Sequence, residues 1–160
     1  MLELEKKFLK TKLGSIISFS VDLKEFSTIK IGTIAFAVCK PKNEKELKLC
    51  IKTLKAIGLK FRIIGNCSNI LFSSNLSHLV LISTVELIGV KIDIKKQELT
   101  ACCGEKLSTC FSKARDLGLS GFESLAFIPA TVLTANPVRL CNRLAKQMID
   151  IPYFCSCKCI

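Results

Sequence analysis

A short polar loop between two apolar runs is the part of this sequence best suited to bind a ligand. It reads Gly65-Asn66-Cys67-Ser68-Asn69 and follows the strand-like run Phe61–Ile64. A turn of small residues at a strand end lets backbone N–H groups converge on one anion, and Ser and Asn side chains add donors. The loop therefore indicates a site for a pyrophosphate. The same residue types also form ordinary turns, so a purely structural role stays open.

Cysteine and histidine are the other residue types here that could bind a metal or react. The chain has ten cysteines and a single histidine, His78. Cys50 and Cys110 fall on the apolar faces of predicted helices, where a free cysteine acts as a small hydrophobic residue. The run Cys155–Cys159 reads C-x-C-x-C and lacks the C-x-x-C spacing of zinc sites. We therefore expect reduced thiols and no metal site.

Two helices and five strand-like runs must position the loop. Asn43 and Glu46 form a capping-box pattern at the start of the first helix. Its apolar face and its end are predicted by Leu47, Cys50, Ile51, Leu54 and Gly58. The second helix is predicted in the same way by Leu107, Cys110, Phe111, Ala114 and Gly118. The strand-like runs are residues 33–39, 60–64, 79–83, 86–92 and 97–103.

Helices and strands do not alternate strictly along the chain, which favours an α+β fold with mixed or antiparallel sheets and flanking helices. A helix is expected over residues 1–20, and the polar run Ser73–Ser77 marks a boundary between two small lobes. The lobes would cover about residues 21–75 and 76–136. Residues 137–160 would then form a separate tail.

Composition and charge restrict the class of protein. The chain has 160 residues, 49% of them hydrophobic, and a net charge of +11, which favours anionic partners. Its lysines are scattered and aromatic residues make up only 7%, so we expect no nucleic-acid partner. No apolar run approaches the ~20 residues that span a bilayer, and the N-terminus is no secretory signal. These features predict a cytoplasmic monomer without a membrane partner.

Three motifs in order give the sequence a family resemblance. They are T-x-x-I-G at Thr28–Gly32, G-x-x-S-N-I-L at Gly65–Leu71, and G-x-E-x-L-A-x-I-P at Gly121–Pro129. Together they resemble the FAD-binding part of the UDP-N-acetylenolpyruvoylglucosamine reductases. That family belongs to the vanillyl-alcohol-oxidase superfamily, which has a PCMH-type FAD-binding domain. The resemblance runs from about Val21 to Asn136.

The resemblance implies a cofactor, a reaction and site residues. Gly65 to Asn69 would cradle the pyrophosphate of FAD, and Ile128, Pro129 and Ala130 would form a second wall of the cleft. Thr28, Ile31 and Gly32 would match the family's entry segment near the flavin, and Gly104 would be the surviving glycine of a G-x-G strand end. In the family, NADPH reduces FAD, which then reduces the enolpyruvyl ether of a UDP-sugar to give a peptidoglycan precursor. The implied partners are therefore the UDP-sugar and NADPH.

This sequence departs from the family pattern at glycines. The pattern has glycine where the chain has Thr33, Cys67, Cys102, Ala130 and Leu133. Glycine permits positive φ, where a side chain costs roughly 1–2 kcal/mol. If three sites carry that cost, FAD binding is expected to weaken by about 3–6 kcal/mol.

No catalytic residue can be assigned. The family's Tyr-Arg and Gly-Ser motifs and its assisting Glu, which bind substrate and supply a proton, have no match in these 160 residues. We therefore expect a flavin-binding fragment with the substrate domain absent and with little or no activity. Three alternatives stay open: a non-catalytic flavin- or nucleotide-binding module, a basic nucleic-acid-binding protein, and an oxidase with FAD attached through His78.

Overall fold

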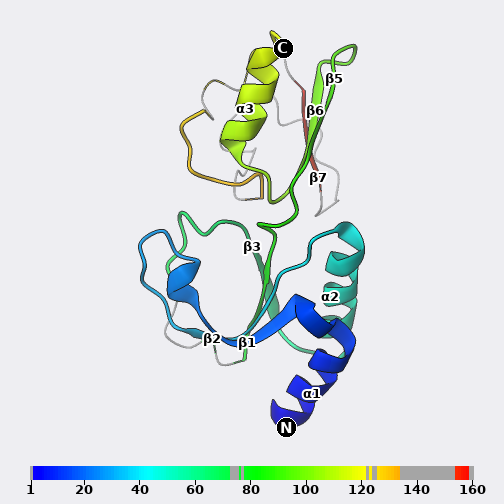
Figure 1. The fold of residues 1–160 in the computed structure, drawn as a ribbon, viewed down its shortest axis with the longest axis vertical. Helices are drawn as coiled ribbons and strands as arrows, with labels where there is room; N and C mark the ends of the chain where they lie inside the picture. Colours follow the sequence, from blue (N-terminus) through cyan, green and yellow to red (C-terminus); the bar gives the residue numbers. More distant parts are fainter. Residues whose placement is uncertain are drawn as a thin grey trace. The chain divides into compact units, whose positions relative to one another are not determined.

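The computed structural model describes residues 2–72, 76, 78–121, 123, 126–133 and 154–158. The chain divides into two compact units, Met1–Glu86 (unit 1) and Leu87–Ile160 (unit 2), and each is described by itself (Figure 1). One four-stranded mixed sheet and one three-stranded antiparallel sheet are accompanied by helices. The predicted α+β class is therefore confirmed.

Unit 1 is built on the four-stranded sheet, in the order β1-β2-β4-β3. Its elements are α1 (Leu2–Leu13), β1 (Ile17–Asp22), β2 (Ile34–Cys39), α2 (Glu44–Ala56), β3 (Phe61–Ile64) and β4 (Val80–Ser83). The short 3-10 helices η1 (Gly14–Ile16) and η2 (Leu23–Glu25) flank β1. β1 is antiparallel to β2, whereas β2, β4 and β3 run parallel. Three strands therefore end at the same edge of the sheet.

The start of α2 follows the predicted capping pattern. The Glu46 backbone N–H donates to Asn43 Oδ1 at 2.9 Å, which satisfies one free donor of the first turn. Glu46 Oε2 accepts from the Lys42 N–H at 2.8 Å, so the carboxylate caps one residue earlier than a standard capping box. Leu47, Cys50 and Leu54 are all fully buried, as their helical spacing predicted.

The N-terminal helix is shorter than the predicted 1–20. It ends at Leu13 because Gly14 adopts φ +55°, and the chain then enters β1 at Ile17. Leu9 and Leu13 of α1 are buried, and α1 contacts both α2 and β1. Residues 17–22 therefore belong to the sheet, an assignment that the lysine-rich start of the sequence concealed.

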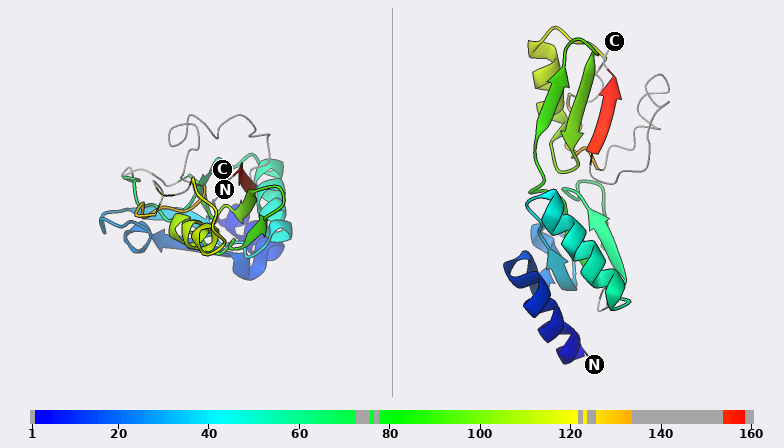
Figure 2. Two further views of the ribbon diagram at one scale, coloured as in Figure 1. Left: turned by 90° about the horizontal axis from the view of Figure 1, so that it is seen from above. Right: turned by 90° about the vertical axis from the view of Figure 1, so that its right-hand side faces the viewer.

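Unit 2 is a helix packed on a hairpin with one added strand. It contains β5 (Val90–Asp93), β6 (Glu98–Cys102), α3 (Leu107–Asp116) and β7 (Phe154–Lys158) (Figure 2). The core joins β6, α3 and the segment after it, through Leu99, Ala101, Leu107, Cys110, Ala114 and Val132. β5 begins later than the predicted strand 86–92, because Gly89 takes φ +149° just before it.

The division between the units falls after Glu86. β4 pairs with β2 and β3, so it belongs to unit 1. Of the predicted boundary Ser73–Ser77, only Leu76 is among the described residues. Within the predicted tail 137–160, residues 154–158 form β7, which pairs antiparallel with β6; the rest of that tail lies outside the described residues.

Candidate functional site

The predicted loop Gly65–Asn69 borders a cavity of about 260 Å³ in unit 1. The lining residues are Glu25, Phe26, Lys40, Gly65, Asn66, Ser83, Val85 and Glu86. Lys40 follows β2, Gly65 follows β3, and Ser83 ends β4. The cavity therefore lies at the carboxyl ends of the three parallel strands, which is where open sheets with parallel strands usually bind ligands.

The end of β3 is fixed to the end of β4 by paired hydrogen bonds. The Thr84 backbone N–H donates to the Ile64 carbonyl at 2.9 Å, and Thr84 Oγ1 donates to the same oxygen at 3.1 Å. Thr84 is fully buried. These bonds hold the entry of the loop at a defined place on the cavity wall.

The loop keeps unused backbone donors. Among the described residues, the N–H groups of Cys67, Ser68 and Asn69 donate no hydrogen bond. Ser68 Oγ donates to Asn66 Oδ1 at 3.4 Å, so the two polar side chains approach each other within the loop. Free N–H groups in a turn with a left-handed residue form a concave anion site. This geometry suits the phosphate interaction predicted for the loop.

Cys67 supplies the left-handed residue of the turn, with φ +53°. Its side chain is 1% exposed and packs in a core cluster with Leu23, Ile64 and Leu81. Sγ lies 3.5 Å from the Gly65 carbonyl oxygen, to which the thiol donates. Since the side chain is in the core, it leaves the backbone donors of the loop uncovered.

The thiol of Cys67 is not poised for redox chemistry. Burial raises its pKa to about 11, so it stays protonated at neutral pH. A reactive cysteine needs a thiolate and an accessible sulfur, and Cys67 has neither. Cys67 therefore has a structural role in the core, not a redox role.

Side chains of both charges line the cavity. Lys40 Nζ lies 4.9 Å from the centre of the Phe26 ring, a cation–π distance. The carboxylates of Glu25 and Glu86 line the same cavity and oppose an anion there. Lys40 is the cation of this lining, so it is the side chain best placed to balance a phosphate.

An unpaired hydroxyl lies next to Phe26. Ser27 is 1% exposed, and its Oγ has no hydrogen-bond partner among the described residues. A buried hydroxyl without a partner costs roughly 1–3 kcal/mol, which water or a polar ligand can recover. A polar group of a ligand could therefore bond to Ser27 Oγ, next to the segment Thr28–Gly32 that resembles the family's flavin entry.

Gly32 in that entry segment has no room for a side chain. A Cβ there would lie 2.7 Å from the Leu23 carbonyl carbon and 2.7 Å from the Lys24 nitrogen. Both are backbone atoms of η2 and move only with the chain. Thr28 and Ile31, the other predicted residues of this segment, are exposed.

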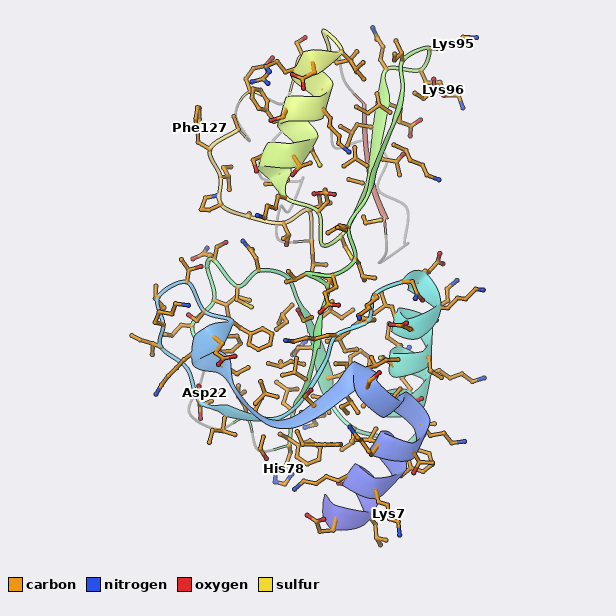
Figure 3. All side chains as sticks on the ribbon, in the orientation of Figure 1. Lys7, Asp22, His78, Lys95, Lys96 and Phe127 are labelled. Carbon is orange, nitrogen blue, oxygen red and sulfur yellow. The ribbon has the colours of Figure 1, made fainter. Side chains whose placement is uncertain are left out.

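The second predicted wall belongs to unit 2. Ile128 and Ala130 pack against its core, and Pro129 is exposed. The Ala130 carbonyl accepts from the Leu107 N–H at 3.0 Å, which ties this turn to the start of α3. Phe127 beside them is 96% exposed and projects away from the ribbon (Figure 3). The structure therefore groups Gly65–Asn69 in one unit and Ile128–Ala130 in the other.

Glu105 is a structural carboxylate that the sequence did not single out. It is 9% exposed, and Oε2 accepts from the Gly89 N–H at 2.9 Å while Oε1 accepts from the Lys106 N–H at 3.0 Å. It therefore joins the approach to β5 to the start of α3. No periodicity marks such a residue, because one of its two backbone partners, Gly89, lies 16 residues away in the sequence.

The expected loss from replaced glycines is smaller than three sites would give. Among the replacements, only Cys67 has positive φ; Thr33, Cys102, Ala130 and Leu133 do not. Those four side chains avoid the left-handed strain that the sequence-based estimate assumed. The condition of three left-handed sites, on which a loss of about 3–6 kcal/mol depends, is therefore not met, and one such site leaves roughly 1–2 kcal/mol.

Comparison with known families decides the class of the domain. The profile of the FAD binding domain matches residues 35–135, more than half of the chain. This chain belongs to the FAD binding domain family. The matched range contains both the Gly65–Asn69 loop and the Ile128–Ala130 turn, so the predicted FAD family is confirmed.

Several similar curated proteins share one name. UDP-N-acetylenolpyruvoylglucosamine reductase of Caldicellulosiruptor saccharolyticus is 41% identical over 113 residues, covering 69% of this chain and 35% of the relative. The protein of that name from Carboxydothermus hydrogenoformans is 35% identical, covering 79% of this chain and 42% of the relative. The chain thus spans about a third to two fifths of the length of these relatives.

Solved structures support the fold. An alkyldihydroxyacetonephosphate synthase aligns with 81% of this chain and 28% of its own, with a TM-score of 0.61 and 15% identity. A variant of berberine bridge enzyme aligns with 70% of this chain and 26% of its own, with a TM-score of 0.55 and 15% identity. At this identity the likeness concerns the fold alone.

The described part of the chain contains no cluster of three His, Cys, Asp or Glu side chains that could hold a metal ion. His78 is exposed in unit 1 (Figure 3). No described helix combines the length and apolar character needed to cross a bilayer.

Proposed function

We propose that unit 1 binds the pyrophosphate of FAD on the Gly65–Asn69 loop. We further propose that the chain is the flavin-binding part of a UDP-N-acetylenolpyruvoylglucosamine reductase of peptidoglycan synthesis. One observation carries the proposal: the loop that matches the family motif borders a cavity at the carboxyl ends of β2, β3 and β4. The curated relatives of that name support the assignment.

The residues present fit this role. The N–H groups of Cys67, Ser68 and Asn69 donate to no described residue, and the Cys67 side chain lies in the core instead of over them. Lys40 supplies a positive charge in the cavity and is held beside the Phe26 ring. That Ile128, Pro129 and Ala130 of unit 2 also contact FAD stays a prediction from the sequence resemblance.

When bound, FAD supplies hydride transfer, from NADPH to the enolpyruvyl group of a UDP-sugar. The task of this chain's residues is to hold and orient the cofactor. The motifs that bind the sugar and donate the proton have no match in these 160 residues. We therefore expect the 160 residues alone to bind FAD as a cytoplasmic monomer without turning over the UDP-sugar.

Fluorescence titration of FAD tests the cavity. Lys40→Glu adds a third carboxylate beside the phosphate and is expected to weaken FAD binding at least about tenfold. Lys42→Glu is the matched control, because Lys42 is exposed two residues away and does not line the cavity. Equal affinities of the two variants would place the cofactor elsewhere.

An activity assay separates binding from turnover. The 160-residue protein is incubated with NADPH, FAD and the enolpyruvyl UDP-sugar, and NADPH oxidation is followed. We expect no substrate-dependent oxidation. Substrate-dependent turnover would show that this chain contains a proton donor that the family motifs do not reveal.

A further inference from the structure

The outer face of α1 exposes two large apolar side chains. Leu4 is 75% exposed and Phe8, one turn later, is 40% exposed. The opposite face already buries Leu9 and Leu13 in unit 1. Helical geometry places Leu4 and Phe8 side by side, away from that buried face. The helix is therefore apolar both toward the sheet and toward its outer side.

Lysines surround this apolar pair. Helical spacing places Lys7 and Lys10 on one side of the pair and Lys12 on the other. Lys12 Nζ lies 6.0 Å from the centre of the Phe8 ring. Lys6 pairs with Glu3 at 3.2 Å, but Lys7, Lys10 and Lys12 make no ion pair with a described residue. Lys7 lies on the outer part of α1 (Figure 3). Three unpaired positive charges therefore ring two exposed apolar groups.

A shallow depression adjoins the same face. Its volume is about 580 Å³, and its lining residues are Glu3, Leu4, Lys6, Lys7, Lys10 and Phe19. Phe19 is on β1 and packs edge-on against Phe36. The depression is therefore lined by two apolar side chains, three lysines and Glu3.

We propose that the outer face of α1 binds the surface of a bilayer that contains anionic lipid. Leu4 and Phe8 enter the boundary between headgroups and acyl chains, and Lys7, Lys10 and Lys12 contact lipid phosphates. Helices that lie on membranes combine these two features, an apolar stripe and flanking lysines. No described helix can cross a bilayer, but a helix that lies in the plane of the membrane does not need to. The proposal departs from the sequence-based expectation of no membrane partner.

The apolar pair favours lipid over nucleic acid. Lysines alone suit either polyanion, because both present phosphates. Exposed Leu and Phe side chains at the centre of the patch gain nothing from a phosphate backbone, whereas they leave water on entering a bilayer. The combination of charges and apolar groups therefore fits a lipid surface.

Vesicle co-sedimentation of the whole chain tests the proposal. Wild-type protein is expected to bind vesicles of mixed phosphatidylcholine and phosphatidylglycerol, and not vesicles of phosphatidylcholine alone. Each lysine near an anionic surface contributes a factor of about five, so Lys7→Glu with Lys10→Glu should lower the partition coefficient about 30-fold or more. Leu4→Ser should lower it about three- to tenfold.

Matched variants in unit 2 separate this face from total charge. Lys95→Glu with Lys113→Glu makes the same change in charge at exposed positions, and Ile94→Ser removes a side chain that is 59% exposed. Both controls should partition within about twofold of wild type. If the charge control loses binding as strongly as the α1 variant, the proposal is overturned.

A gain-of-function variant covers the case in which the α1 charge reversal fails to fold. Thr11 is exposed between Lys7 and Lys12, and Thr11→Lys should raise the partition coefficient about fivefold. An unchanged coefficient would contradict the proposal. Duplex DNA is the competing partner. The proposal would also be overturned if the charge reversal at Lys7 and Lys10 abolished binding to duplex DNA but left binding to vesicles unchanged. Dimerisation abolished by Leu4→Ser would assign the face to a second copy instead.

Discussion

Cys67 in unit 1 and Cys102 in unit 2 both stand where the reductase pattern has glycine, yet their backbones differ. Cys67 has φ +53° in a turn and is 1% exposed. Cys102 ends the strand β6, without positive φ, and is partly exposed. The first position keeps the conformation that favours glycine, and the second has become an ordinary strand residue.

The difference shows that a lost glycine has no fixed cost. Cys102 pairs with Phe154 across β6 and β7, and extended backbone accepts any side chain. Cys67 keeps its left-handed conformation while its thiol contributes to the core cluster. The penalty thus depends on the backbone at each site, so the effects of variants should differ between the two units.

The largest loss of stability is expected on substitution of Gly32, a glycine of the family pattern that unit 1 has kept. Gly32→Ala brings a Cβ to 2.7 Å from the η2 backbone and should lower the free energy of unfolding by about 3 kcal/mol. Urea denaturation measures it. Gly14→Ala is the control, because Gly14 has φ +55° but open space around it, and about 1–2 kcal/mol is expected there. A larger loss at Gly14 would contradict this account.

Alkaline pH should affect Cys67 more than Cys102. Burial raises the pKa of Cys67 from 9.0 to about 11, so the folded state holds a proton that the unfolded chain loses first. The resulting stability is complete below pH ~9 and falls as pH rises through ~11, by about 2–3 kcal/mol in all. Denaturation at pH ~9 and pH ~11 should show a smaller loss of stability in Cys67→Ala than in wild type, because the other buried thiols remain.

Cys102→Ala is the matched control for that slope. Burial, and then the charge of Glu105, raise the pKa of Cys102, but its side chain is only partly buried. Its removal should therefore change the pH dependence less than the removal of Cys67. If Cys102→Ala flattened the curve more, the contrast between the two cysteines would be wrong.

A smaller effect is expected from Glu105, which anchors the turn after Cys102. Glu105→Ala leaves the N–H groups of Gly89 and Lys106 without their carboxylate and should destabilise unit 2 by about 2 kcal/mol. Glu123→Ala removes an exposed carboxylate that, among the described residues, accepts from the Gly121 N–H alone, and should cost less than about 1 kcal/mol. Hydrogen exchange in β6 and α3 would report the difference.

The smallest and most specific effect is the difference in stability between alanine and glycine variants at residues 67 and 130. At residue 67, glycine should be more stable than alanine by about 1 kcal/mol, because it removes the strain of positive φ. At residue 130, the protein with glycine should be less stable than the protein with alanine by about 0.5–1 kcal/mol. Glycine relieves no strain there, and it only increases the conformational freedom of the unfolded chain. The same sign at both sites would refute the comparison.

Local patterns predicted the helices well. The Asn43 cap and the apolar spacing of α2 depend on neighbouring residues only, so the sequence contained all the information they need. The Gly65–Asn69 loop was also found, because small polar residues follow an apolar run. The FAD binding domain match confirmed the family that the three motifs indicated.

Features that depend on pairing between distant segments were not predictable in this way. Lys40 joins the cavity only because β2, β4 and β3 run parallel, and no single-sequence pattern gives that register. β1 was hidden in a predicted helix, and β7 in a predicted tail. The sequence also could not show that Cys67 alone, among the replaced glycines, has positive φ.

The visible absorption spectrum of the purified chain, after incubation with excess FAD and desalting, tests the central claim most directly. This account predicts retained flavin bands at about one FAD per chain, because the loop donors are uncovered and a single strained glycine replacement remains. A colourless protein with no retained FAD would contradict it. The family resemblance would then record descent without cofactor binding.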